Sequence, residues 1–218
     1  MTLSKLTTAD KKRITQDWNE LFPSLGVYKP IHLINRIGPI LVGILLEVKS
    51  WNNSYIPTFH VHNLVRPFPV ITLGLASTLN RQSVSLEFHE KKYRELAKIM
   101  SKNLLIPLEG DVELDKVLSG FKKYIENPTF PFQIEVYEYM ILVSAWCGNT
   151  VEVQKAIDLA KKETYNWPEH VFARIGGVES WLNKLKEEAS DSEKLKKICE
   201  NQVIELKVDK LPSRNILY

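Results

Sequence analysis

Two histidines in the run Phe59-His60-Val61-His62-Asn63 have residue types and a spacing that could do chemistry. Side chains alternate across a β-strand, so His60 and His62 are expected on one face, and Phe59 and Val61 on the other, toward the core. Two imidazoles on one face can bind the same metal ion, although zinc needs at least one more protein ligand. The remaining histidines are the first candidates for that ligand: His32, His89 and His170.

The spacing of His60 and His62 by itself favours metal binding only weakly. The chain has neither an HExxH motif nor a closely spaced cysteine pair that would complete a site. A metal-dependent hydrolase that uses these two histidines is therefore the alternative interpretation, and no metal site or cofactor is predicted. The nucleophile motif GxSxG and the phosphate-binding motifs GxxxxGKS/T and GxGxxG are also absent, so the sequence favours a protein that is not an enzyme.

The preferred interpretation is a polar sheet face that recognises a partner. If neighbouring strands keep register, polar side chains of several strands gather on the less apolar face of the sheet. The guanidinium of Arg36 offers parallel donors to a carboxylate or phosphate, and a structural ion pair with Glu47 is an equal alternative. The residues predicted to bind are Arg36, His60, His62 and Asn63.

The elements that must position these residues can be recognised from composition and periodicity. Thr7 or Thr8 is a suitable N-cap for a helix that Pro23 ends, with Ile14 and Trp18 on its apolar stripe. Charge is then sparse over residues 30–77, where β-branched and aromatic residues dominate. We predict consecutive antiparallel strands at residues 31–36, 40–49, 55–63 and 70–77, and a short edge strand at 83–88.

The rest of the chain has helical periodicity. One helix is predicted at residues 112–126 with Asp111 as its N-cap, and a second at 132–146 is apolar almost all round, as expected of a central helix. Gly148 is predicted to adopt a left-handed conformation, and Asn149 to cap the next helix, which makes a tight helical hairpin. The tail from Leu211 is expected to be irregular.

Composition and charge narrow the class of protein. The chain has 218 residues, of which 44% are hydrophobic and 25% charged, as in ordinary globular proteins. Residues 1–104 contain 14 Lys and Arg against 7 Asp and Glu, whereas residues 105–218 contain 15 against 19. The basic clusters are short and lie beside acidic residues, and no nucleic-acid-binding motif is present, so nucleic acid is not the expected partner.

The predicted compartment is the cytoplasm. The first 20 residues are polar and do not resemble a signal peptide. The longest apolar run is far shorter than the roughly 20 residues of a membrane span. Cys147 and Cys199 do not have the spacing of a disulfide framework or a zinc site. The sequence predicts an α+β fold: an N-terminal helix, an antiparallel sheet of four or five strands, and a C-terminal helical lobe. The two lobes are expected at residues 1–104 and 105–218, packed on one another as one compact unit. The predicted function is non-catalytic binding of another protein, and the class considered is an inhibitor or immunity-type protein that occupies a toxin or enzyme surface.

Overall fold

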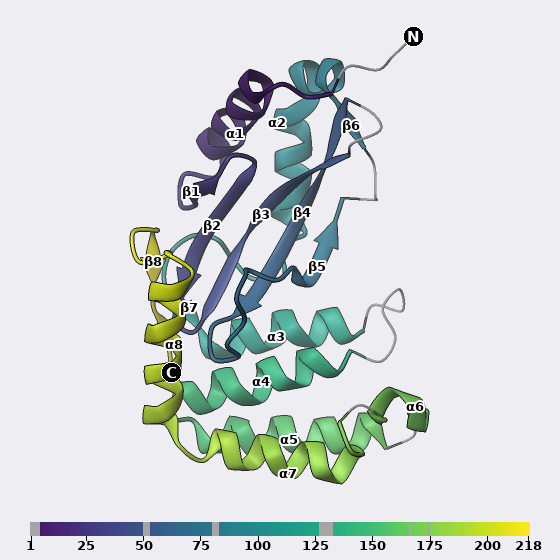
Figure 1. The fold of residues 1–218 in the computed structure, drawn as a ribbon, viewed down its shortest axis with the longest axis vertical. Helices are drawn as coiled ribbons and strands as arrows, with labels where there is room; N and C mark the ends of the chain where they lie inside the picture. Colours follow the sequence, from purple (N-terminus) through teal and green to yellow (C-terminus); the bar gives the residue numbers. More distant parts are fainter. Residues whose placement is uncertain (1–4, 50–52, 80–82, 127–132, 166, 174) are drawn as a thin grey trace.

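A computed structural model describes residues 5–49, 53–79, 83–126, 133–165, 167–173 and 175–218. The first helix, α1 (Thr8–Leu21), is followed by an antiparallel sheet of five main strands and then by helices, which confirms the predicted α+β class. Figure 1 shows the sheet in the upper part of the molecule, with α1 and α2 (Leu86–Lys102) beside it and the remaining helices below.

The five main strands lie in sequence order, and each pairs antiparallel with the next. A strand of two residues, β6 (Val84–Ser85), pairs with the beginning of the fourth strand. Only the second half of the predicted strand at 70–77 forms, and the first strand was not predicted because its four residues lack an apolar pattern. The main strands are β1 (Gly26–Lys29), β2 (His32–Ile37), β3 (Ile40–Lys49), β4 (Ser54–Asn63) and β5 (Gly74–Thr78).

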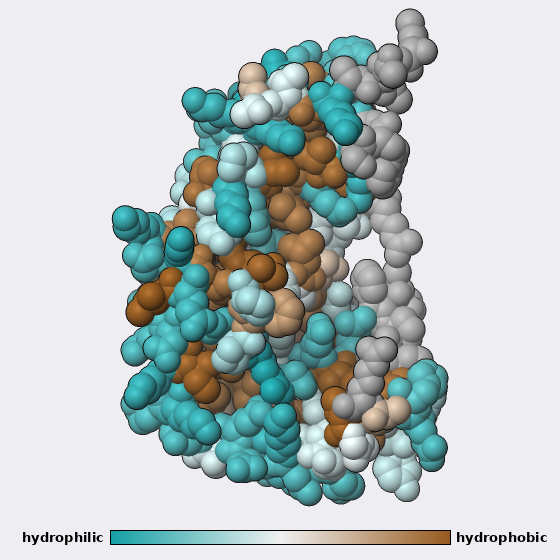
Figure 2. Space-filling view, viewed as in Figure 1, coloured by the Kyte–Doolittle hydropathy of each residue, from teal (hydrophilic) through white to brown (hydrophobic). Residues whose placement is uncertain are grey.

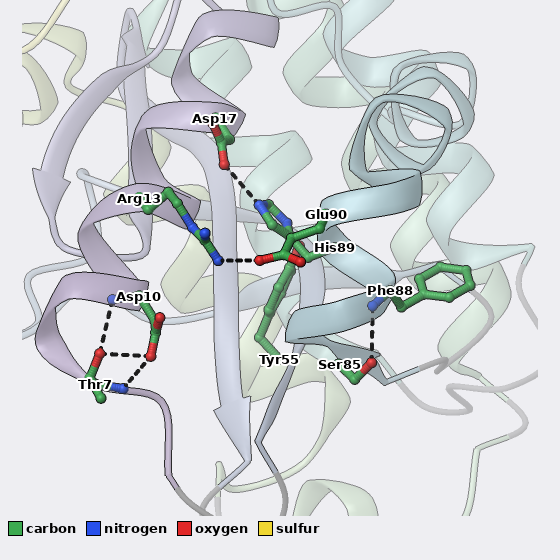
Figure 3. Close-up of polar contacts among 9 residues, drawn as sticks. All are labelled: Thr7, Asp10, Arg13, Asp17, Tyr55, Ser85, Phe88, His89 and Glu90. Carbon is green, nitrogen blue, oxygen red and sulfur yellow. Dashed lines mark hydrogen bonds and ion pairs between the residues drawn. The ribbon is translucent and has the colours of Figure 1, made fainter.

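One face of the sheet packs against α1 and α2. In the ladder between β3 and β4, Ile44 lies opposite Phe59 and Val42 opposite Val61, and all four side chains are buried on this face. Trp18 of α1 reaches the same face, where its indole Nε1–H donates to the hydroxyl of Tyr55 over 3.0 Å. The first helix begins as predicted, because Thr7 and Asp10 form a reciprocal capping box (Figure 3).

The helical part of the chain surrounds one central helix. Residues of α4 are buried on nearly every side, as its apolar composition predicts. The hairpin before α5 is also confirmed: Gly148 has φ +73°, and the Asn149 carboxamide oxygen accepts from the Glu152 N–H over 3.1 Å. The helices are α3 (Leu114–Ile125), α4 (Ile134–Trp146), α5 (Thr150–Thr164), α6 (Glu169–Phe172), α7 (Val178–Ala189) and α8 (Ser192–Glu205).

The C-terminal tail is not irregular, contrary to expectation. Its strand β8 (Ser213–Arg214) pairs parallel with β2, and β9 (Ile216–Leu217) pairs parallel with β7 (Val112–Glu113). Asp111 therefore does not cap a helix: its carboxylate accepts from the Asn215 N–H over 2.9 Å, and α3 begins only after β7. The division of the chain into two lobes at residue 104 stays a prediction. The C-terminal tail makes hydrogen bonds with residues before and after this position.

No helix in the described part of the chain is both long enough and apolar enough to cross a membrane.

Candidate functional site

The second face of the sheet carries a row of histidines on β2 and β4. Register places Ile34, Gly43 and His60 side by side on this face, and Arg36, Leu41 and His62 in the next row. The Nε2 atoms of His32 and His60 are 2.8 Å apart, so one ring donates a hydrogen bond to the other. The expected alternation along β4 is thus present: the histidines lie on one face of the sheet, and Phe59 and Val61 lie on the other.

The histidines on this face are buried, which differs from the polar open face that the sequence suggested. His60 is 0% exposed and His62 1%, since the segment at residues 64–73 and Tyr139 of α4 lie over the ends of the strands. Burial lowers the pKa of His62 to about 4 and that of His32 to about 4, with Lys29 adding to the effect at His32. Burial also holds the pKa of His60 well below its usual range, and all three rings are neutral at pH 7.

His62 is fixed in one tautomer by its surroundings. The backbone N–H of Thr72 donates to His62 Nδ1 over 3.1 Å, so Nδ1 is an acceptor and the proton of the neutral ring resides on Nε2. The neighbouring Asn63 is oriented in the same manner, because its Oδ1 accepts from the Val65 N–H over 3.0 Å. Both side chains therefore present a nitrogen donor in the direction away from these contacts.

Three such donors have no hydrogen-bond partner within the described residues: His62 Nε2, Asn63 Nδ2 and Arg66 Nε. All three residues line one cleft of about 680 Å³, which lies between the segment after β4 and the helices α4 and α7. Each of these buried donors without a partner in the described residues costs about 1 to 3 kcal/mol.

Ion pairs hold the cleft together across the two parts of the molecule. The guanidinium of Arg66 lies 3.1 Å from Glu138 of α4 and 3.2 Å from Glu188 of α7. Trp181 donates its indole N–H to the same Glu138 carboxylate over 3.0 Å. These contacts fix the positive charge of Arg66 beside the buried donors, while its Nε–H stays unpartnered in the described structure.

The four residues predicted to bind are not all brought together. His62 and Asn63 line the cleft, whereas His60 is buried against His32. Arg36 lies beside Cys199 of α8, where its charge acts on the thiol. The proposed ion pair between Arg36 and Glu47 does not form. Arg36 lies opposite Leu41, and Leu41 and Glu47 are six residues apart along β3, a distance of about 20 Å in an extended strand. Glu47 pairs instead with Lys49.

The hydrolase alternative gains no support from this arrangement. His60 and His62 have different partners, and among the described residues no group of three or more His, Cys, Asp or Glu side chains is placed to hold a metal ion.

A second constellation joins α1, β4 and α2 (Figure 3). His89 Nε2 lies 2.9 Å from a carboxylate oxygen of Asp17, and its Nδ1 lies 2.6 Å from the Tyr55 hydroxyl. The order Asp, His and hydroxyl is that of a nucleophilic triad, but burial raises the pKa of Tyr55 far above its usual value, and the hydroxyl already accepts from Trp18. A raised pKa does not favour the Tyr55 hydroxyl as a nucleophile, and the hydrogen bonds join α1, β4 and α2.

The segment after β4 carries an apolar surface over the histidine face. We call its three exposed hydrophobic residues the loop triad: Phe68 is 48% exposed, Val70 58% and Leu73 40%. Figure 1 draws this segment in front of the sheet, with α2 behind. Figure 2, seen from the same side, shows hydrophobic residues gathered over the strands, and Leu45 and Ile56 are half-buried on this face.

Comparison with protein-family models, curated proteins and solved structures found no significant match to the chain. The site therefore stands on its own geometry. Sequence reasoning missed Arg66, Glu138 and Trp181 because they meet only through the packing of α4 and α7 on the sheet. The signal that could have indicated the loop triad is Pro67 and Pro69 on either side of Phe68, since two residues without an N–H disfavour a central strand.

Proposed function

We propose that the protein is a non-catalytic binding protein that recognises another protein through the loop triad. The observation that carries the proposal is the exposure of Phe68, Val70 and Leu73 within six residues of one another. Exposed apolar groups are common singly, but a contiguous group on a connecting segment is typical of protein interfaces.

The segment that presents the triad is anchored by hydrogen bonds along its length. The Leu64 N–H donates to Pro39 O over 2.9 Å, the Phe68 N–H to Gln202 Oε1 over 3.0 Å, and the Thr72 N–H to His62. A partner that binds such a segment loses little free energy to ordering it, so its apolar side chains can contribute most of their buried area to affinity.

The reactive groups of the chain support binding rather than catalysis. Burial raises the pKa of Cys147 to about 12 and that of Cys199 to about 11, so neither thiol forms a nucleophilic thiolate near pH 7. The histidines His32, His60 and His62 have lowered pKa values and are engaged with one another or with Thr72. Within this class we favour an inhibitor or immunity-type protein of the cytoplasm, in which an anchored apolar segment covers the surface of a toxin or an enzyme.

A capture experiment with matched variants tests the proposal. Wild-type protein, Phe68→Ser/Val70→Ser and the control Val151→Ser are immobilised and exposed to extract from the source cells. Val151 is 62% exposed on α5, outside the loop triad. We expect wild type and the control to recover the same protein at fixed stoichiometry and the double variant to lose it, with all three equally folded by circular dichroism. Equal recovery by the double variant would refute binding through the loop triad.

A further inference from the structure

The charged side chains of α2 divide into those that are paired and those that are not. Lys91 Nζ lies 2.7 Å from a carboxylate oxygen of Glu87, and Lys92 Nζ lies 2.7 Å from one of Glu95. The remaining glutamate of this helix, Glu90, pairs over 3.0 Å with an arginine of α1 (Figure 3). Every carboxylate of α2 is therefore engaged, and the other cations of the helix have none on α2 to pair with.

Three cations of α2 remain, and they are spaced four residues apart: Arg94, Lys98 and Lys102. All three are exposed, and none has an ion pair or a side-chain hydrogen bond within the described residues. Arg94 Cζ lies 5.2 Å from the centre of the Tyr93 ring, a contact that gives its N–H groups no hydrogen-bond acceptor. A helix rises about 1.5 Å per residue, so the three charges form a row about 12 Å long.

The row lies on the exposed side of α2. Four residues turn a helix by about 40° beyond a full turn, so the three cations share one face. The buried side chains Leu96 and Met100 lie on the opposite face. Like charges four residues apart destabilise a helix. The row therefore weakens the helix in the free protein, whereas carboxylates of a partner would convert the same charges into ion pairs.

This surface is separate from the loop triad. Figure 1 draws the segment after β4 in front of the sheet and α2 behind it. A partner can therefore bind to α2 whether or not the triad is occupied, and the inference goes beyond the proposed function. The row also belongs to the part of the chain in which cations dominate, since residues 1–104 contain 14 Lys and Arg against 7 Asp and Glu. Long-range attraction thus favours an acidic partner.

The surroundings of the row favour a protein over a continuous polyanion. Ile99 is 48% exposed and lies three residues before Lys102, so a partner that reaches the row also covers an apolar side chain. A protein that makes about six to ten phosphate contacts on a nucleic acid uses at least twice as many cations as this row offers. Glu95 beside the row would also repel a phosphate backbone. An acidic helix, in contrast, places carboxylates four residues apart at the same spacing of about 6 Å.

We propose that Arg94, Lys98 and Lys102 form a docking surface for an acidic helix of a partner protein. Carboxylates four residues apart on that helix pair with the three cations, and an apolar side chain beside them covers Ile99. Each ion pair is exposed and contributes little by itself, so recognition depends on the match in spacing between the two rows of charge.

An alanine-based peptide helix with glutamates at four-residue spacing tests this surface, and the same peptide with glutamines is its uncharged counterpart. Each peptide is titrated into ¹⁵N-labelled protein at pH 7.5 and about 20 mM salt, where charges act over about 20 Å. We expect the glutamate peptide to shift the backbone amides of residues 94–102 with a Kd on the order of 0.1 to 1 mM. At about 300 mM salt its affinity should fall by at least about fivefold.

Two variants of equal net charge separate the row from charge in general. The first replaces the whole row, as Arg94→Gln/Lys98→Gln/Lys102→Gln, and should bind the glutamate peptide about tenfold more weakly than wild type. The control should change the affinity by less than about twofold. It replaces three exposed lysines of other helices that also have no ion pair within the described residues: Lys123→Gln, Lys186→Gln and Lys197→Gln. Melting curves verify that both variants are folded.

Several results would overturn the inference. Equal weakening in both variants would mean that only total charge matters, and equal affinity for the glutamine peptide would mean that carboxylates are not recognised. A DNA duplex, or phosphatidylcholine vesicles with about 30% phosphatidylserine, could bind more tightly than the peptide and lose that binding in the row variant; the surface would then belong to a nucleic acid or a membrane. A dimer at low salt that the row variant abolishes would assign it to a second copy of the chain. None of these results affects capture through the loop triad, which lies on the other side of the sheet.

Discussion

Acidification should destabilise the protein because three histidines are buried in their neutral form. In the unfolded chain a histidine has a pKa near 6.5, whereas His32 and His62 have a pKa of about 4 in the folded protein. Below pH 6.5 the unfolded state therefore binds protons that the folded state does not, and the free energy of unfolding falls as the pH falls toward 4.

The size of the effect follows from these pKa values. At pH 5 an unfolded histidine is almost fully protonated and folded His62 is almost fully neutral, which corresponds to a loss of about 2 kcal/mol relative to pH 7.5. His32 adds a similar loss, and His60 a further loss of the same sign. Since whole domains are stable by only about 5 to 15 kcal/mol, this loss is a large fraction of the total stability.

Urea unfolding followed by tryptophan fluorescence at pH 7.5 and pH 5.0 measures this loss. In His62→Gln the amide oxygen still accepts from the Thr72 N–H, but the titrating group is gone. The difference in unfolding free energy between the two pH values should then be about 2 kcal/mol smaller than in wild type. The control His170→Gln removes an exposed histidine and should show the wild-type difference. Other titratable groups are common to all three proteins and cancel.

Two results would refute this reasoning. A wild-type loss of less than about 1 kcal/mol between the two pH values would mean that the histidine face admits water or protons readily. An equal loss in wild type and His62→Gln would mean that other groups cause the acid sensitivity. A change in the slope of the urea transition between conditions would have to be excluded first, because it reports a change in the unfolded ensemble.

Four further predictions concern stability. Phe59→Ala should lower the unfolding free energy by about 3 to 5 kcal/mol, because it opens a cavity under α1 and α2. His62→Ala should lower it by about 1 to 3 kcal/mol, because the Thr72 N–H loses its acceptor. Urea denaturation measures both losses, and a negligible loss for His62→Ala would contradict the burial of His62. Gly148→Val should cost about 1 kcal/mol or more, since a β-branched residue is strained at φ +73°, and an unchanged melting temperature would remove that explanation. Asn149→Ala should cost about 0.5 to 2 kcal/mol and Asn149→Asp almost nothing in the same thermal assay; equal losses would show that the cap to Glu152 is unimportant.

The candidate site was only partly predictable. The sequence pointed to His62 and Asn63, which line the cleft, and to His60 and Arg36, which do not. Strand alternation places His60 and His62 on one face, but their partners are decided by what lies above each of them. His60 meets His32 across β3, while His62 meets a segment that returns from the end of β4.

What the sequence determined by itself is local. The capping box at Thr7, the left-handed Gly148 and the alternation along β4 depend on residues within a few positions of one another, so their patterns are readable in one dimension. Tertiary structure decided the rest. Arg66 meets Glu138 and Glu188, and the tail pairs with β2, through contacts between residues 70 to 180 positions apart in the sequence. Such contacts depend on complementary surfaces of whole elements. The burial of the histidines on the second sheet face has the same cause, because an alternating strand shows which side chains share a face and not what the rest of the chain places over it.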